Sequence, residues 1–400
     1  MRCFILTFAL CAFLLLPAVA ESGSGYFHGS ASNIFYAWQD AGYHLRARQA
    51  LALNAGSGSW LISGSLGGLL DFNSDFKNLT PARDYLGVYS LYAGSRELLD
   101  HKLTLLVGRQ FLSPGLSVGC LDGVYAAYAF SPRFAGSAYV GVDALYDRSA
   151  RIYNISEGVT TGATFDARRL FDNQTDAQFF YLVKASDAPF WEIGGVNLRN
   201  RSFTSLTLSS QLQFDFLNER FHRAALSCRK EITTDLEVGA GISQTYPQIY
   251  SNAYFSYFRI SARQVLRADA DWTFYKSLRV HGQYRFLNFE ADNAQQVSAT
   301  LGNDNGGVGL LFETGYSGRQ ISLTADYSRD LGDYWNLSAN IDYSKYKSEE
   351  QLSFENSLAN ALRASCRLGR SWQISLEGQW MMNPLKDYDA RVLNRVQYRW

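Results

Sequence analysis

Several features that would place this chain in a familiar class are scarce or missing. It has 5 cysteines in 400 residues and contains no Cys-X-X-Cys, no Cys-X-X-Cys-His and no Cys/His cluster. Zinc ribbons, iron–sulfur centres and covalently attached haem therefore lack ligands. The 7 prolines argue against a disordered or collagen-like chain. The 37 basic and 37 acidic residues cancel, so no nucleic-acid partner is indicated.

A helical membrane span is also missing. The longest uncharged stretch beyond the N-terminus is Gln49 to Leu70, which contains Asn54, four serines and five glycines. The Gly/Ser cluster at residues 55–59 predicts a turn between two strands. Elsewhere charges recur too often for an apolar helix of about 20 residues.

The first 20 residues have the pattern of a cleaved signal peptide. Arg2 precedes an apolar stretch that ends in Pro17 and the small residues Ala18-Val19-Ala20. We predict a mature chain that begins near Glu21. Cleavage would leave an odd number of widely spaced cysteines, so disulfides are not expected to hold the fold: Cys120, Cys228 and Cys366.

Four segments of the mature chain alternate in polarity with almost no error: Leu206 to Phe216, Leu266 to Phe274, Trp335 to Tyr343 and Trp372 to Met382. One face of each carries no charge, and only Ser210 and Gly378 on it lack an apolar or aromatic side chain. On the opposite face every residue except Met381 is polar. Successive side chains of a strand point to opposite sides, so each segment is predicted to be a strand with one apolar and one polar face.

Alternation alone also fits a soluble sandwich whose apolar faces meet in a core. Two features favour a membrane barrel instead. The segments are about ten residues long, as a tilted membrane-crossing strand requires. Aromatic residues also recur near their ends, where the membrane interface would lie: Trp272 and Phe274, Trp335 and Tyr343, Trp372 and Trp380.

The end of the chain resembles the C-terminal strand of Gram-negative outer-membrane β-barrel proteins, which are exported to the cell outer membrane. In that family the last residue is aromatic, a second aromatic lies two before it, and apolar residues continue on alternate positions. Val392, Val396, Tyr398 and Trp400 match this pattern, and Asn394 departs from it. The resemblance implies that the outer-membrane assembly machinery reads this strand, and that the strand closes the barrel against the first one.

Face parity constrains the hairpin that follows Leu266 to Phe274. Directly paired residues of antiparallel strands share a face, so a three-residue turn Tyr275-Lys276-Ser277 is predicted. It pairs Phe274 with Leu278 on the outer face. The other predicted pairs are Trp272 with Val280, Ala270 with Gly282 and Ala268 with Tyr284 outside, and Thr273 with Arg279, Asp271 with His281, Asp269 with Gln283 and Arg267 with Arg285 inside.

We therefore predict an all-β fold in which residues 21–400 form a single closed antiparallel transmembrane β-barrel. About 23 segments qualify as strands, but the number should be even. At about 20 to 25 residues per strand the chain would hold about 16 to 18 strands, with 22 as an upper bound. The turns at residues 275–277 and 368–371 fall on the periplasmic side. The turn Ser131-Pro132-Arg133 then falls outside the cell, unless one candidate strand between Gly158 and Tyr257 is false.

The inward charges of such a barrel would set its function. The pore-lining candidates are Arg267, Asp269, Asp271, Arg279, His281, Gln283, Arg285, Glu377 and Arg395. They would form either a mixed-charge constriction or structural ion pairs on a wall that no solute touches. No catalytic, metal or cofactor site is predicted, because the histidines are scattered and neither Gly-X-Ser-X-Gly nor His-Glu-X-X-His occurs.

The function expected from this resemblance is that of a porin-like channel for the passive diffusion of small hydrophilic solutes. One alternative is a barrel that serves as a sheath or exporter in a larger envelope complex, such as the porin partner of multihaem cytochromes or a polymer exporter. A membrane-embedded hydrolase is a weaker alternative. Expected partners are outer-membrane lipid, lipopolysaccharide and the assembly machinery, with further copies of the chain or cytochromes left open.

Overall fold

The fold is known from a computed structural model, which describes residues 25–400 except 40–42, 72–84, 113–118, 145–155, 157, 187–188, 248–261, 276, 291, 317, 348–352 and 385. The predicted signal peptide lies outside the described residues. The elements, in chain order, are β1 (Gly25–Gln39), β2 (Tyr43–Ser57), β3 (Trp60–Asp71), β4 (Tyr85–Glu97), α2 (Leu98–His101), β5 (Leu103–Leu112), β6 (Gly119–Ala129), β7 (Phe134–Asp143), β8 (Val159–Arg169), α3 (Leu170–Asn173), β9 (Thr175–Ala185), β10 (Pro189–Phe203), β11 (Leu206–Asp215), β12 (Arg220–Thr233), β13 (Leu236–Thr245), β14 (Arg263–Tyr275), β15 (Leu278–Asn288), β16 (Asn293–Asn303), β17 (Gly306–Gly315), β18 (Gly318–Leu331), β19 (Trp335–Lys347), β20 (Glu355–Leu368), β21 (Trp372–Asn383) and β22 (Lys386–Arg399).

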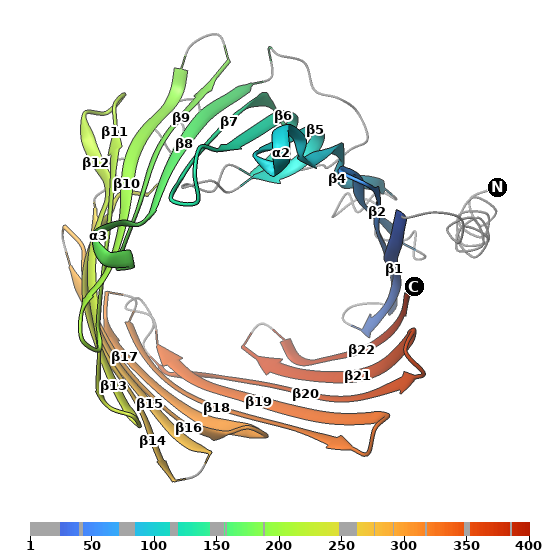
Figure 1. Cartoon of the computed structure of the whole chain (residues 1–400). Helices are drawn as coiled ribbons and strands as arrows, with labels where there is room; N and C mark the ends of the chain where they lie inside the picture. Colours follow the sequence, from blue (N-terminus) through green and yellow to red (C-terminus); the bar gives the residue numbers. More distant parts are fainter. Residues whose placement is uncertain are drawn as a thin grey trace.

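These strands form one closed antiparallel sheet of 22 strands (Figure 1). Each strand pairs with the next along the chain, and β22 pairs with β1 from Ser30 opposite Arg399 to Gln39 opposite Ala390. Backbone hydrogen bonds between Gly29 and Trp400 extend this seam to the last residue. A single all-β barrel closed by its terminal strands is thus what the sequence predicted.

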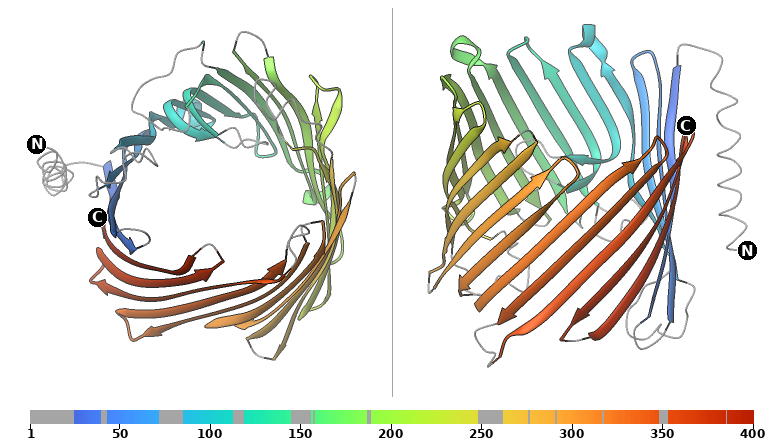
Figure 2. Two further views of the ribbon diagram at one scale, coloured as in Figure 1. Left: turned by 180° about the vertical axis from the view of Figure 1, so that it is seen from behind. Right: turned by 90° about the horizontal axis from the view of Figure 1, so that it is seen from below.

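The two rims of the barrel differ in the length of their connections (Figure 2). At the rim where β22 ends, here called the C-terminal rim, every connection has two to five residues. At the opposite rim connections reach 17 residues, between β13 and β14. The turns after β6, β14 and β20 all lie at the C-terminal rim. The turn Ser131-Pro132-Arg133 is therefore on the same side as the other two, and one candidate strand between Gly158 and Tyr257 was false.

The strand number equals the upper bound of the prediction and exceeds the expected 16 to 18. From Gly25 to Trp400 the chain uses about 17 residues per strand and connection, rather than the 20 to 25 assumed from other barrels. The difference arises because ten of the connections are so short. Almost the whole described chain is therefore wall.

The β14–β15 hairpin has the predicted register along its length. Trp272 lies opposite Val280, Asp271 opposite His281 and Arg267 opposite Arg285. The predicted turn was wrong in one detail, because Leu278 pairs with Tyr275 and not with Phe274. A β-bulge between Thr273 and Tyr275 absorbs the extra residue and keeps both strands on their faces.

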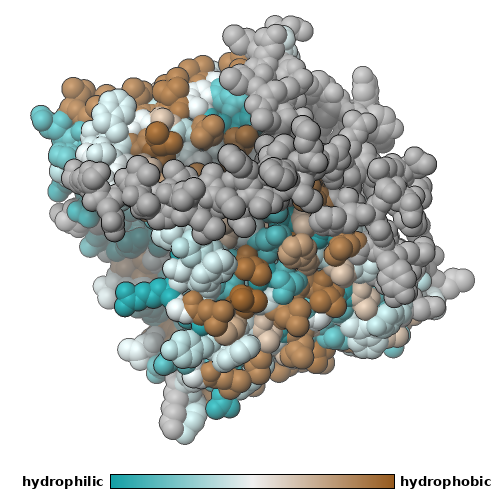
Figure 3. All heavy atoms as spheres, turned by 90° about the vertical axis from the view of Figure 1, so that its right-hand side faces the viewer, coloured by the Kyte–Doolittle hydropathy of each residue, from teal (hydrophilic) through white to brown (hydrophobic). Residues whose placement is uncertain are grey.

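The outer wall is apolar. Large hydrophobic side chains stay exposed there on alternate positions, among them Leu310, Leu323, Ile341 and Leu376. Figure 3 shows hydrophobic side chains gathered beside hydrophilic ones on the wall near the seam. Near the C-terminal rim, Trp372 and Tyr398 lie with ring centroids 4.6 Å apart, and Tyr398 and Trp400 lie 5.7 Å apart. An apolar band bordered by aromatics is the surface that a barrel presents to lipid.

Buried apolar side chains form one cluster on the inner wall, at strands β5, β6, β7, β9 and β10. Their registers place them on the face opposite the lipid-facing one: Leu112, Leu121, Tyr139, Phe180, Leu182, Trp191 and Ile193. Gly162 of β8 makes room for Tyr139, whose hydroxyl oxygen would lie 2.3 Å from a Cβ at that position. We call this cluster the apolar patch. It is the most deeply buried part of the described chain, and Leu121 and Ile193 have no exposed surface.

Among the described residues, no helix is both long and apolar enough to cross a membrane. Residues 49–70 instead form parts of β2 and β3, joined by the turn at Gly58 and Ser59.

Candidate functional site: the charged inner wall

The nine candidate residues lie on strands β14, β15, β21 and β22. On β14 and β15 they alternate with the exposed outer residues Leu266, Trp272 and Tyr284. On β21 and β22 they alternate with Leu376 and Val392, which are also exposed. All nine therefore point to the inner face. The two groups are well separated along the ring and do not form one constriction (Figure 1).

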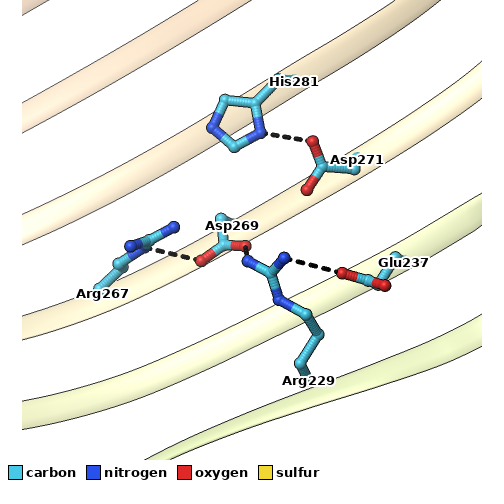
Figure 4. Close-up of polar contacts among 6 residues, drawn as sticks. All are labelled: Arg229, Glu237, Arg267, Asp269, Asp271 and His281. Atoms are coloured by element: carbon cyan, nitrogen blue, oxygen red, sulfur yellow. Dashed lines mark hydrogen bonds and ion pairs between the residues drawn. The ribbon is translucent and has the colours of Figure 1, made fainter. Parts of the chain in front are cut away.

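The centre of the first group is Asp269, whose side chain is only 5 % exposed. It accepts hydrogen bonds from two arginines: Arg267 Nε lies 2.8 Å from Oδ1, and Arg229 Nη2 lies 3.0 Å from Oδ2. Arg229 also lies 2.9 Å from Glu237, between Nη1 and Oε1. Two guanidinium groups and two carboxylates thus form a balanced network across β12, β13 and β14 (Figure 4). Charge-assisted hydrogen bonds of this kind are the stronger ones in proteins.

Gly239 allows this network to cross a strand. It lies between Arg229 of β12 and Asp269 of β14, opposite both. A Cβ at Gly239 would lie 2.7 Å from Asp269 Oδ2, closer than real Cβ contacts come. The missing side chain therefore opens the space in which the Asp269 carboxylate reaches Arg229.

Two further contacts of this group differ in their surroundings. His281 Nδ1 lies 2.7 Å from Asp271 Oδ1, on facing positions of β15 and β14, with both side chains partly exposed. Arg279 lies beside the C-terminal rim and contacts Asp304 at 3.0 Å, where both side chains are more than 60 % exposed. Exposed ion pairs contribute little to stability, so the Arg279 pair is a rim contact.

Arg267 and Arg285 face each other across β14 and β15, which would place like charges together. The structure separates them because each turns away from the other. Arg267 contacts Asp269, and Arg285 Nη1 donates to Gln296 Oε1 at 3.3 Å on the next strand. Gln296 in turn donates to Glu313 at 2.6 Å. Gln283 lies between Asp269 and Ser298 in the register.

The second group lies next to the seam. Glu377 of β21 accepts hydrogen bonds from Arg363 of β20 and from Gln379, whose Nε2 lies 2.6 Å from Oε1. Arg395 faces Ser375 across β21 and β22. On the same inner face Arg391 lies 2.8 Å from Asp389, which is almost fully buried.

Sequence reasoning missed Arg229, Glu237 and Gly239. Parity had been applied to the β14–β15 hairpin only, and the same rule carried back across the two-residue turn at Thr234 and Asp235 places all three beside Asp269. It also missed Arg363, which faces Glu377 directly. Among the described residues, no group of three or more His, Cys, Asp or Glu is placed to hold a metal ion.

The arrangement favours a hydrated wall with fixed charges of both signs. Most of its carboxylates are engaged by arginines, and most of these arginines keep a large exposed fraction. Arg267 and Arg229 are 44 % and 48 % exposed while Asp269 is nearly buried. Water at this wall therefore meets guanidinium groups more than carboxylates.

Comparisons with known proteins bear on the fold. No family model matches the sequence, and no curated protein matches it. A mutant of the ferric enterobactin receptor PfeA of Pseudomonas aeruginosa has a similar structure, with a TM-score of 0.66 and 9 % identity over 94 % of this chain and 80 % of that one. Two other outer-membrane channel structures cover 99 % of their own length: OpdK of Pseudomonas aeruginosa, with a TM-score of 0.43, 10 % identity and 94 % of this chain, and OccAB4 of Acinetobacter baumannii, with 0.47, 11 % and 95 %. Only the first score is high enough to support a common fold, and at 9 % identity it concerns the fold alone.

Proposed function

We propose that this chain is an outer-membrane barrel that acts as a porin-like passage for small hydrophilic solutes. The observation that carries the proposal is the division of its wall. Exposed apolar side chains occupy one face of the closed sheet, and charged, hydrogen-bonded side chains occupy the other. A closed sheet with this polarity satisfies its backbone in lipid and keeps water on the inside.

The width of the ring supports a passage. With strands about 4.8 Å apart and tilted by about 40°, 22 of them close into a ring about 44 Å across between backbones. Within the part of the chain that is described, every substantial contact between elements joins sheet neighbours, so no described strand or helix crosses the lumen. The nine candidate residues would then line the path of the solute.

The location and orientation follow the same argument. The signal-peptide pattern of residues 1–20 supports export, and the aromatic C-terminal strand supports assembly in the outer membrane. Short turns of bacterial outer-membrane barrels face the periplasm, and long loops face the outside. The C-terminal rim is therefore assigned to the periplasm, and Val392, Val396, Tyr398 and Trp400 are proposed as the assembly signal.

The strand number favours a second candidate. Barrels of 16 to 18 strands leave an aqueous channel, while outer-membrane transporters of 22 strands carry a plug in the lumen. A barrel this wide could hold a folded partner, and the sheath or exporter function in a larger envelope complex remains the alternative. A hydrolase is less well supported, because among the described residues His281 makes no hydrogen bond to a Ser, Thr or Cys.

Swelling of proteoliposomes in sugars of graded size separates the two candidates. The refolded mature chain should admit mono- and disaccharides at rates that fall with solute size, and protein-free liposomes should not. An 18-stranded porin in the same lipid provides the size reference, and the wider ring should admit larger sugars. Folded barrels that admit no sugar, and that copurify with a haem protein from native membranes, would support the sheath instead.

A further inference from the structure

A hollow of about 570 Å³ lies on the inner wall at strands β8 to β12, away from the nine candidate residues. Its floor is made of small side chains, because Ser209 of β11 faces Ser227 of β12, and Gln211 faces Ala225. Longer side chains border it, notably Arg199 of β10 and Arg223 of β12. Small residues between long ones are what leave the space. We call this hollow the arginine cavity.

The charges of the arginine cavity are unequally paired. Arg168 lies 3.7 Å from Asp166, which also accepts a hydrogen bond from Gln178 at 2.8 Å. The other carboxylate, Asp176, accepts the backbone N–H of Arg169 at 3.0 Å. Within the described part of the chain, Arg199 and Arg223 have no carboxylate within ion-pair distance. Two guanidinium groups thus remain available on one side, with carboxylates and amides on the other.

We propose that the arginine cavity binds a small organic anion that also carries several hydroxyl groups, such as a sugar acid. The anionic group would lie against Arg199 and Arg223, since guanidinium groups match carboxylates in charge and in donor geometry. The hydroxyl groups would meet Asp166, Gln178 and the serine floor. A second negative charge at that end would be repelled by Asp166 and Asp176. The volume lies within the range of small-molecule sites.

This inference rests on the proposed function only for its use, since it names the solute class that the passage would favour. Binding itself does not require conduction. The inner position of the cavity on β8 to β12 would place the bound anion near the C-terminal rim, where β10 and β11 meet.

Calorimetry on the full mature barrel, folded in detergent, tests the proposal with gluconate, and with glucose and glucosamine as neutral and cationic probes of similar size. Gluconate should bind saturably, at least tenfold more tightly than either sugar. The double variant Arg199→Gln/Arg223→Gln should lose at least tenfold in gluconate affinity. Arg367→Gln, which removes an inward charge near the same rim on the far side of the ring, should change it less than twofold.

The proposal is overturned if gluconate and glucose bind equally, if gluconate does not bind, or if Arg367→Gln weakens binding as much as the double variant. Heat-modifiable migration in gels verifies that each variant is folded. Sugar influx into proteoliposomes is measured in parallel. Binding without influx would overturn the proposed function and support the cavity, whereas influx without gluconate binding would do the reverse.

Discussion

Two stretches of the inner wall obtain their order in different ways. The apolar patch on β5 to β10 excludes water, and its Leu121, Leu182 and Ile193 are at most 1 % exposed. The Asp269 network on β12 to β14 stays hydrated, because the arginines that hold it are nearly half exposed. The hydrophobic effect stabilises the first in proportion to the area removed from water. Hydrogen-bonded charges position the second at little net gain in stability.

This difference teaches where structure and function are separable in the barrel. Substitutions in the apolar patch should change folding and leave the charge of the lumen unaltered. Substitutions in the network should change the field inside the lumen and cost less stability. The following predictions test this contrast, beginning with the largest effect.

Leu182→Ala should produce the largest loss of stability. The side chain is 1 % exposed within the apolar patch, so its truncation leaves a cavity and costs about 2–5 kcal/mol of unfolding free energy. Leu331→Ala, at the exposed end of β18, should cost about 0.5 kcal/mol or less. Urea unfolding in lipid vesicles, followed by tryptophan fluorescence, measures both. Equal costs would contradict the assignment of the patch as the core.

Asp269→Asn should cost less and should change selectivity. The amide keeps the shape but leaves Arg229 and Arg267 without their shared carboxylate, at about 1–3 kcal/mol. The lumen gains one net positive charge, so the reversal potential in a salt gradient should move toward that of the anion. A shift toward the cation would refute the inward placement of Asp269.

Gly239→Ala tests the bridge between strands. A Cβ there would displace the Asp269 carboxylate from Arg229, at about 1 kcal/mol. Gly282→Ala is the matched control, because a Cβ at Gly282 meets nothing within 4 Å. The first variant should shift the reversal potential in the same direction as Asp269→Asn and by less. If both glycine variants behave alike, Gly239 has no role in the bridge.

Arg279→Gln should have the smallest effect. Its pair with Asp304 is 67 % and 69 % exposed, so the loss should be about 0.5 kcal/mol or less. High salt should abolish even that difference. A loss above that of Gly239→Ala, measured in the same vesicles, would show that the rim pair is structurally important.

The sequence predicted those parts of the fold in which the two faces of a strand differ. The β14–β15 register followed from parity because Leu266, Trp272 and Val280 are outside while Asp269 and Arg279 are inside. It predicted the closing contact of β22 with β1 from the resemblance of the last strand.

The apolar patch was not predicted, because strands that are apolar on both faces show no alternation. Residues 179–183 of β9 are Phe-Phe-Tyr-Leu-Val, of which Phe180 and Leu182 are buried and Phe179 and Tyr181 are exposed outside. A period of two is invisible in such a run. The Asp269 network needed the registers of two hairpins at once, and the arginine cavity needed three.

The central claim is that the barrel encloses a continuous water-filled path. Single-channel conductance of the refolded mature chain in a planar bilayer tests it most directly. The account predicts stable ohmic steps larger than those of an 18-stranded porin in the same bilayer, with a reversal potential that Asp269→Asn shifts toward the anion. A folded, heat-modifiable barrel that inserts and never conducts would contradict it.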